Sequence, residues 1–192
     1  MSDSPLRHAP IIVVAGPSGV GKGTVIAWAR EHLPQAWLSV SATTREPRPG
    51  EIDGVNYHFM SPALFDAMAS AGGFLEWAEY AGNRYGTPLQ PLLDHAAAGQ
   101  PVLLELELQG ARQVRSRLPH ATLVFIKPPS WEELVRRLTD RGTESPEVVE
   151  RRLATAREEM ACELEFDRTI VNDAVERAGQ ALVDLLDSAS TK

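Results

Sequence analysis

The stretch V-V-A-G-P-S-G-V-G-K-G-T, residues 13–24, decides the fold of this chain. Before its glycines, the β-branched and apolar run 11–15 predicts a short buried strand of a parallel sheet. Gly16 interrupts that run, and a segment with helical character follows Lys22. A strand, a glycine-rich turn, a lysine and a helix, in this order, are typical of a loop that binds the phosphates of a nucleotide.

The chemistry of such a loop explains its composition. Glycines allow the backbone to turn its N–H groups inward, and the helix that follows points its positive end toward an anion. Lys22 adds a compact positive charge for the outer phosphates. Gly23 stands where the pattern G-x-x-x-x-G-K-[ST] places a magnesium-binding hydroxyl, and Thr24 comes one residue later, about 100° further round the helix. A glycine-rich turn with an incidental lysine is the alternative interpretation.

The bulk properties are those of a globular domain rather than of a nucleic-acid-binding or membrane protein. The 192 residues can form one domain, with an apolar fraction of 43% and a charged fraction of 23%. The formal net charge of −7 argues against a general nucleic-acid binder, whose affinity depends on a basic surface. We also expect no membrane partner, because no apolar run of about 18 residues is present.

Cysteine and histidine usage narrows the compartment and the possible metal chemistry. Cys162 is the only cysteine, which excludes an internal disulfide and favours a reducing compartment. The first residues, M-S-D-S-P-L-R-H, have no apolar signal core. The five histidines are scattered without ligand spacing, which argues against a structural zinc site. We therefore expect a cytoplasmic protein.

Strands and helices alternate along the chain, which predicts an α/β fold with a parallel sheet and helices on both of its faces. The expected core strands are 11–15, 101–108, 121–126 and 169–171. Residues 41–87 are interpreted as an inserted unit, in which Ser61 caps a helix. The strands of that unit are expected at 54–60, 74–80 and 83–87. The helix expected at 147–164 has many charges and few apolar positions, as in an exposed flap.

Polar residues occur where core strands are expected to end, and open α/β sheets bind ligands at the carboxyl ends of their strands. Glu105 and Glu107 lie near the end of one such strand, and Asn172 follows another. The period of two puts both carboxylates on one face of the strand, opposite the leucines at the even positions 104–108. Two carboxylates beside a phosphate loop suit a hydrated magnesium ion or a ligand amine, and a solvated strand face is the alternative.

A second anion site is indicated by the loop that Pro47 and Pro49 stiffen, T-T-R-E-P-R-P-G at residues 43–50. Four donors in or near this loop could clamp a phosphate, because guanidinium groups and phenol hydroxyls all donate to phosphate oxygens. They are Arg45, Arg48, Tyr57 and Tyr85. Two surface arginines with two half-buried tyrosines are an equally good interpretation of the spacing alone.

Glu76 is the one acid between the apolar residues of the run F-L-E-W-A, residues 74–78. Its carboxylate could accept two hydrogen bonds from the edge of a guanine, where N1–H and N2–H₂ are donors. Considered as a single residue, a surface glutamate is the favoured alternative.

The motifs of this chain, taken together and in order, resemble those of guanylate kinases. The resemblance runs from about residue 11 to residue 186. Its motifs are G-P-S-G-V-G-K, S-x-T-T-R-x-P-R-x-G-E, D-G-x-x-Y-x-F, F-L-E-W-A, G-N-x-Y-G-T, L-E-L-E-L-Q-G, P-P-S, R-G-T-E and I-V-N-D. It implies a P-loop nucleoside-monophosphate kinase fold, with a parallel sheet core flanked by helices, an inserted nucleotide-binding flap and a helical lid.

The boundaries that the resemblance implies divide a single domain, residues 1–192, into three parts. The core is expected at about 10–40, 88–136 and 165–188, the GMP-binding flap at about 41–87 and the lid at about 137–164.

The resemblance further implies transfer of the γ-phosphoryl group of ATP to GMP or dGMP, with Mg²⁺ on the ATP and a place in purine nucleotide metabolism. The residues implied to bind ATP are Gly16, Pro17, Ser18, Gly19, Val20, Gly21, Lys22, Gly23, Thr24 and Asn172. Those implied to bind GMP are Ser41, Arg45, Arg48, Tyr57, Glu76, Tyr85, Thr87 and Glu107. The implied catalytic residues are Lys22, Arg45, Arg137, Arg141 and Arg152. Metal contacts are implied for Glu105, through water, and for Thr24.

Two departures from the family pattern fall in this site. Guanylate kinases usually have Lys-Ser where this chain has Lys22-Gly23, and the Lys-Gly-Thr sequence resembles the loop of adenylate kinases. The usual Asp-x-Asp is here Glu105-x-Glu107, so each acid is one methylene longer.

Two other functions are alternatives to this activity. One is a non-catalytic guanylate-kinase-like module that binds proteins, and the retained Lys22 argues against it. The other is a related kinase that acts on a sugar bisphosphate, for which the base-contacting set Ser41, Glu76 and Thr87 would have no use.

Overall fold

The computed structural model describes residues 9–80, 82–140 and 146–190. Its main sheet contains five parallel strands in the order β2-β7-β1-β8-β9. These strands are β1 (Ile11–Ala15), β2 (Trp37–Leu38), β7 (Val102–Glu105), β8 (Thr122–Lys127) and β9 (Arg168–Val171). The predicted parallel sheet is confirmed, and β1, which leads into the phosphate loop, lies at its centre.

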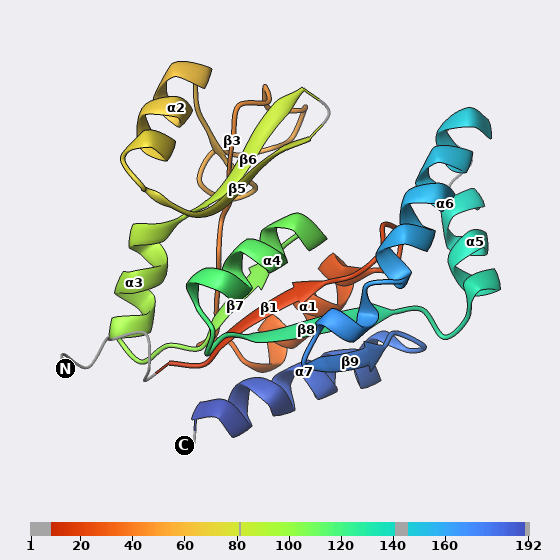
Figure 1. Cartoon of the computed structure of the whole chain (residues 1–192). Helices are drawn as coiled ribbons and strands as arrows, with labels where there is room; N and C mark the ends of the chain where they lie inside the picture. The colour runs from red at the N-terminus through yellow and green to blue at the C-terminus, as the bar shows by residue number, and fades with distance from the viewer. Residues whose placement is uncertain (1–8, 81, 141–145, 191–192) are drawn as a thin grey trace.

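Helices cover both faces of this sheet (Figure 1). One face carries α1 (Lys22–His32) and α7 (Val175–Ser190), and the other carries α3 (Leu89–Ala97) and α4 (Leu108–Arg117). Alternate side chains of β1 therefore enter different cores: Ile12 and Val14 pack with α1 and α7, whereas Ile11 and Val13 pack with α3 and α4. Burial on both faces explains why this strand is apolar at every position.

A second, mixed sheet lies above the first one in Figure 1, in the order β4-β3-β6-β5. Its elements are β3 (Ala42–Thr43), β4 (His58–Phe59), β5 (Phe74–Tyr80), β6 (Asn83–Pro88) and the helix α2 (Pro62–Ser70). Phe65 of α2 and Phe74 of β5 stack in its small core, with ring centroids 4.4 Å apart. The predicted cap is confirmed, because the Ser61 hydroxyl accepts a hydrogen bond from the N–H of Leu64.

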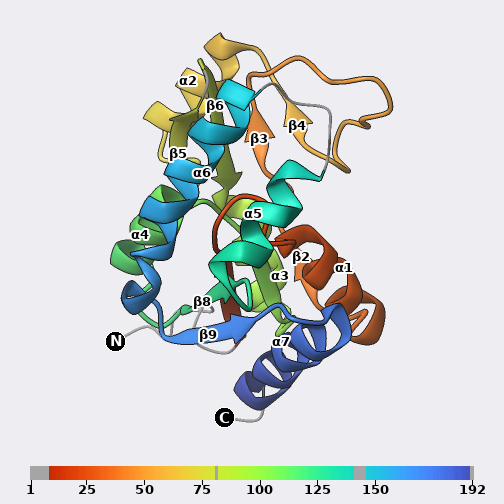
Figure 2. The same ribbon diagram turned by 90° about the vertical axis from the view of Figure 1, so that its right-hand side faces the viewer.

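The third part of the structure is helical. It consists of α5 (Trp131–Thr139), α6 (Pro146–Met160) and a short 3₁₀ helix at Glu163–Glu165. Figure 2 shows α6 running in front of β5 and α4, with α5 beside it. The expectation of an exposed helix is wrong at two positions of α6, because Ala156 and Glu159 are buried. None of the described helices is long and apolar enough to cross a membrane.

Two predicted strands are shorter in the structure. The strand expected at 54–60 is reduced to β4, at the edge of the second sheet. The strand expected at 101–108 ends at Glu105, and Leu108 begins α4 instead. The N–H of Leu106 still donates to the carbonyl of Val14 in β1, so the segment after β7 leaves the sheet only beyond this bond.

Candidate active site

The phosphate loop joins β1 to α1, and two of its glycines cannot be replaced without displacing backbone or a buried amide. Gly16 has φ 151°, and a Cβ added there would lie 2.2 Å from the carbonyl oxygen of Ile126. Gly21 has φ 93°, and its Cβ would lie 2.8 Å from Nδ2 of Asn172. Close approach of neighbouring elements therefore requires glycine at both positions.

Lys22 is the first residue of α1, so its charge lies at the same helix end as the free N–H groups of the first turn. Its Nζ donates to the carbonyl of Gly16 across 2.6 Å. Gly23 and Thr24 are exposed on the same turn. The loop thus presents the donors that an anionic phosphate chain requires.

The predicted residues Asn172 and Arg137 both hold the phosphate loop from outside. Asn172 is buried and donates from Nδ2 to the carbonyl of Val20 across 2.8 Å. Arg137 donates to that same carbonyl at 3.1 Å and to the backbone oxygen of Asn172 at 3.0 Å. Glu133 accepts a third bond from Arg137. The contacts predicted for these residues, with adenine and with the transferring group, stay predictions.

Helix α6 reaches the loop at Ser18. Arg152 donates from Nη2 to the Ser18 hydroxyl across 3.0 Å, and Glu159 accepts from the Ser18 N–H across 3.0 Å. Two of the three predicted lid-region arginines, Arg137 and Arg152, therefore contact the loop. Arg141 lies outside the described residues.

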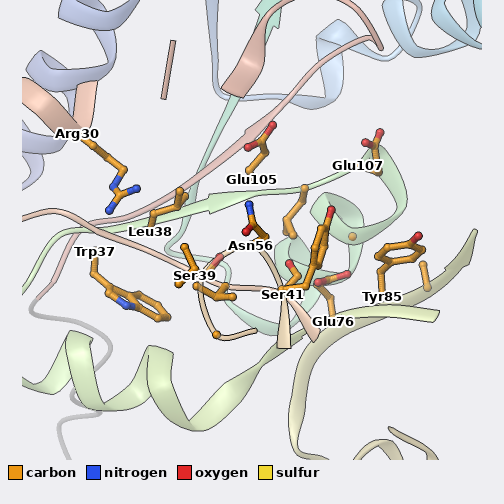
Figure 3. A pocket seen from close by; sticks show the side chains of 18 of the residues that line it. Arg30, Trp37, Leu38, Ser39, Ser41, Asn56, Glu76, Tyr85, Glu105 and Glu107 are labelled. Carbon is orange, nitrogen blue, oxygen red and sulfur yellow. The ribbon is translucent and has the colours of Figure 1, made fainter. Parts of the chain in front are cut away.

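A cavity of about 830 Å³ opens between the two sheets and gathers most of the residues predicted to bind GMP. Those that line it are Ser41, Tyr57, Glu76, Tyr85 and Glu107, together with Glu105. In Figure 3, Ser41 and Glu76 lie near each other at one side of this cavity, while Glu105 and Glu107 extend from the neighbouring strand end. The cavity thus joins the second sheet to the end of β7.

Glu76 is buried in this cavity wall, with only 5% of its surface exposed. A register shift in the β5–β6 pairing between Phe74 and Glu76 sets the side chain opposite Thr87. Oε1 of Glu76 accepts from the Thr87 N–H at 3.0 Å and from its hydroxyl at 2.7 Å. Burial raises the pKa of Glu76, whereas the bonds from Thr87 and the charge of Arg117 lower it. The surface-glutamate interpretation is therefore wrong.

Glu51 holds Arg45 next to Arg48, another residue predicted to bind phosphate. The Arg45 guanidinium donates to Oε1 of Glu51 across 2.8 Å, and the Arg48 N–H donates to Oε2 across 2.7 Å. The same guanidinium lies 5.5 Å from the centre of the Tyr57 ring. A hydrogen bond between Arg45 and Tyr85 contributes to the raised pKa of Arg45, after the larger effect of Glu51. The Arg45 guanidinium, Tyr57 and Tyr85 therefore form one cluster, whereas Arg48 is exposed and joins it through its backbone N–H to Glu51.

Glu105 lies at the border between the cavity and the phosphate loop. Its Oε1 is 4.0 Å from where a Cβ on Gly23 would be. Desolvation raises the pKa of Glu105 and the charge of Lys22 lowers it, which places this carboxylate in the field of the loop lysine. No cluster of three or more metal-ligating side chains exists within residues 9–80, 82–140 and 146–190. This donor set fits a Mg²⁺ ion held mainly by nucleotide phosphates and water, which is the usual arrangement for that ion.

Several residues that shape the site carry no role in the sequence-based prediction. They are Glu51, Gly110, Arg117 and Glu159. Glu51 closes the quoted motif S-x-T-T-R-x-P-R-x-G-E, so its position was available in the sequence. Glu159 had no such signal, because it is one of many charges on its helix.

Comparisons with known proteins agree with this geometry. The family profile described as guanylate kinase matches residues 8–189. A guanylate kinase of Thermobifida fusca is 59% identical over all of this chain and 96% of that protein. One from Streptomyces coelicolor is 60% identical over 91% of this chain and 89% of its own. The crystal structure of guanylate kinase from Anaplasma phagocytophilum superposes with a TM-score of 0.77 at 32% identity, over 96% of this chain and 87% of that one. The chain belongs to the guanylate kinase family.

Proposed function

We propose that this protein transfers the γ-phosphoryl group of ATP to GMP or dGMP, giving ADP and GDP or dGDP. The observation that supports this function best is the position of Glu105, which lines the acceptor cavity and also lies beside Gly23 of the phosphate loop. A donor nucleotide on the loop and an acceptor in the cavity would therefore meet at this border. Such proximity is the main requirement of phosphoryl transfer.

Glu76 selects guanine in this proposal. Its carboxylate faces the cavity while Thr87 holds it in place, and Ser41 and Glu107 complete the contacts to the base. Guanine offers N1–H and N2–H₂ donors to a carboxylate, whereas adenine offers neither. An adenine in this place would leave a buried carboxylate without partners, and sites of this kind reject the wrong substrate strongly.

The cluster of Arg45, Arg48, Tyr57 and Tyr85 binds the phosphate of the acceptor. The acceptor oxygen is already anionic near neutral pH, so the reaction needs no general base. These donors instead hold the acceptor phosphate in line and reduce its repulsion with the donor phosphates. The preassembly of Arg45 by Glu51 limits the reorganisation that binding requires.

The phosphate loop, Lys22 and the arginines bind and neutralise the donor phosphates. The proposed catalytic arginines are Arg45, Arg137, Arg141 and Arg152. Mg²⁺, when bound with ATP, supplies charge neutralisation and orientation of the phosphates. Glu105, through water, and Thr24 are the protein groups proposed to hold it, since Gly23 has no hydroxyl. Such arginines can contribute on the order of 10³-fold or more to turnover.

Closure of the flap (41–87) and the lid (137–164) over the core completes the site in this proposal. The cavity between the two sheets is open, and an open site would allow water to take the phosphoryl group. Action in the cytoplasm, within purine nucleotide metabolism, is part of the same proposal.

A coupled assay over GMP, dGMP, AMP, UMP and CMP tests this function. We expect turnover with the guanine nucleotides and far weaker turnover with the others. Equal rates over the panel would refute base selection by Glu76. If no nucleotide were turned over but the protein bound a protein partner, the non-catalytic module would be favoured instead.

A further inference from the structure

Glu159 is a buried acid that the proposed mechanism does not use. It lies near the end of α6 and is only 8% exposed, although the helix around it is strongly charged. A buried carboxylate is unfavourable unless hydrogen bonds compensate for lost water. The contacts of Glu159 therefore deserve a functional explanation.

Glu159 and Arg152 hold Ser18 of the phosphate loop at two different atoms. Oε2 of Glu159 accepts from the Ser18 N–H, and Nη2 of Arg152 donates to the Ser18 hydroxyl, each across 3.0 Å. The two residues are seven positions apart, so they share one face of α6. Figure 1 shows the end of this helix beside the loop that leaves β1.

Two further charged groups face Glu159, one from each nucleotide site. Burial is the main cause that raises the pKa of Glu159, and the Ser18 N–H lowers it. The nearby carboxyl of Glu107, which lines the acceptor cavity, raises that pKa further, and the charge of Lys22 lowers it. Glu159 thus contacts the loop directly and lies in the electrostatic field of a residue of the acceptor cavity.

The helix fixes this carboxylate in place. Ala156, one turn before Glu159, is fully buried in the core formed with α1 and α7, and Leu153 packs against the same core. A side chain on such an anchored turn is suited to position the loop that it contacts.

We propose that Glu159 is a positioning residue: through the Ser18 N–H it fixes the phosphate loop for donor binding, and through Glu107 it makes donor binding respond to the acceptor. This inference rests on the proposed function. It predicts that the hydrogen-bond acceptor at position 159 matters more than its charge, because a glutamine can also accept from the Ser18 N–H.

Calorimetric titration with a non-hydrolysable ATP analogue and Mg²⁺, with and without saturating GMP, tests the proposal. Glu159→Ala should weaken analogue binding at least tenfold and bring the ratio of the two dissociation constants, with and without GMP, toward one. Glu159→Gln should stay within about threefold of the wild type. Glu158→Ala, at the exposed neighbouring position, is the matched control and should change neither quantity.

Three results would overturn the proposal: unchanged binding in Glu159→Ala, tighter binding in it, or a failure of Glu159→Gln to restore affinity. If Glu159→Ala does not fold, Glu159→Asp takes its place, because the shorter acid loses reach to Ser18, and at least fivefold weaker binding is expected. Wild-type protein that binds the analogue but phosphorylates no GMP would refute the proposed function and leave the comparison at position 159 intact.

Discussion

A single carboxylate oxygen of Glu76 accepts two hydrogen bonds from Thr87, at 3.0 Å from the N–H and at 2.7 Å from the hydroxyl. The two residues are paired across β5 and β6, so the sheet itself aligns them. Oε1 is thereby committed to the protein, so in the proposed function Oε2 is the oxygen left for the base. Base selection, as proposed, would then depend on Thr87 as well as on the acid that it orients.

Thr87→Val should reduce kcat/KM for GMP about tenfold or more. The change removes the hydroxyl bond and keeps the N–H bond and the side-chain shape, and hydrogen bonds to charged groups contribute about 1.5–3 kcal/mol. Steady-state assays with GMP and with ATP as the varied substrate will show whether the loss is confined to the acceptor. Thr139→Val, on an exposed helix position, is the control. An equal reduction of kcat/KM for ATP would contradict a role confined to acceptor binding.

Glu76→Gln should raise the thermal stability at neutral pH while it impairs GMP turnover. Burial raises the pKa of Glu76, so above that folded-state pKa the ionised carboxylate destabilises the fold. This destabilisation disappears as the pH falls and the carboxyl is protonated. The variant is neutral throughout, so its Tm should exceed that of the wild type at pH 8, by about 2–4 °C for each kcal/mol.

Melting curves from pH 4 to pH 8 check this prediction, with Glu79→Gln at an exposed position of the same strand as control. The difference in Tm should shrink on acidification. A difference that grows toward pH 4 has the wrong sign for a carboxyl with a raised pKa.

Gly110→Ala should damage acceptor binding by displacing Glu76. A Cβ at position 110 would lie 2.7 Å from Oε2 of Glu76 and 3.2 Å from its Cδ, so the carboxylate must shift. Displacement of a binding group by about 1 Å can cost on the order of 10²-fold in rate, and we expect that loss in kcat/KM for GMP. Ser116→Ala, exposed on the same helix, is the control. Unchanged KM for GMP would mean that Glu76 can move aside freely.

Gly23→Ser should strengthen Mg²⁺ binding in the presence of nucleotide. The nearest atom to a Cβ at this position is Oε1 of Glu105 at 4.0 Å, so a serine fits without strain. Calorimetric titration of the ATP analogue at several Mg²⁺ concentrations should show an affinity for the ion about tenfold higher. Gly23→Ala, which adds the carbon without the hydroxyl, should behave as wild type. Identical results for the two variants would show that no hydroxyl at position 23 reaches the ion.

The sequence predicted the elements whose causes are local. Ser61 caps α2 because its hydroxyl and the following proline act within one turn, and the phosphate loop follows from its glycines and Lys22. The strand expected at 101–108 was predicted too long, because its alternating pattern continues past Glu105. The leucine at 108 equally fits the apolar spacing of α4, with Ala111 and Val114 buried, and the tertiary contacts decide between the two.

The roles of two acids depended on distant parts of the chain. Glu76 looks like a surface residue until β6 pairs with β5 and buries it beside Thr87. Glu159 is one of several acids on a charged helix. Its burial follows from the packing of α6 onto the phosphate loop, where it accepts from the N–H of a residue 141 positions earlier in the chain. No local pattern encodes such separations, so these roles emerged only from the fold.

The contact between Arg45 and Glu51 means that an anion bound at the proposed acceptor site would exchange with an internal carboxylate. The guanidinium is already paired with a carboxylate, so an incoming phosphate must compete with that internal anion. A weak monoanion gains little by the exchange, whereas a phosphate dianion with several acceptor oxygens gains more bonds than it displaces. We therefore expect the internal pair to lower the affinity for anions in general and to raise the selectivity for the doubly charged nucleotide.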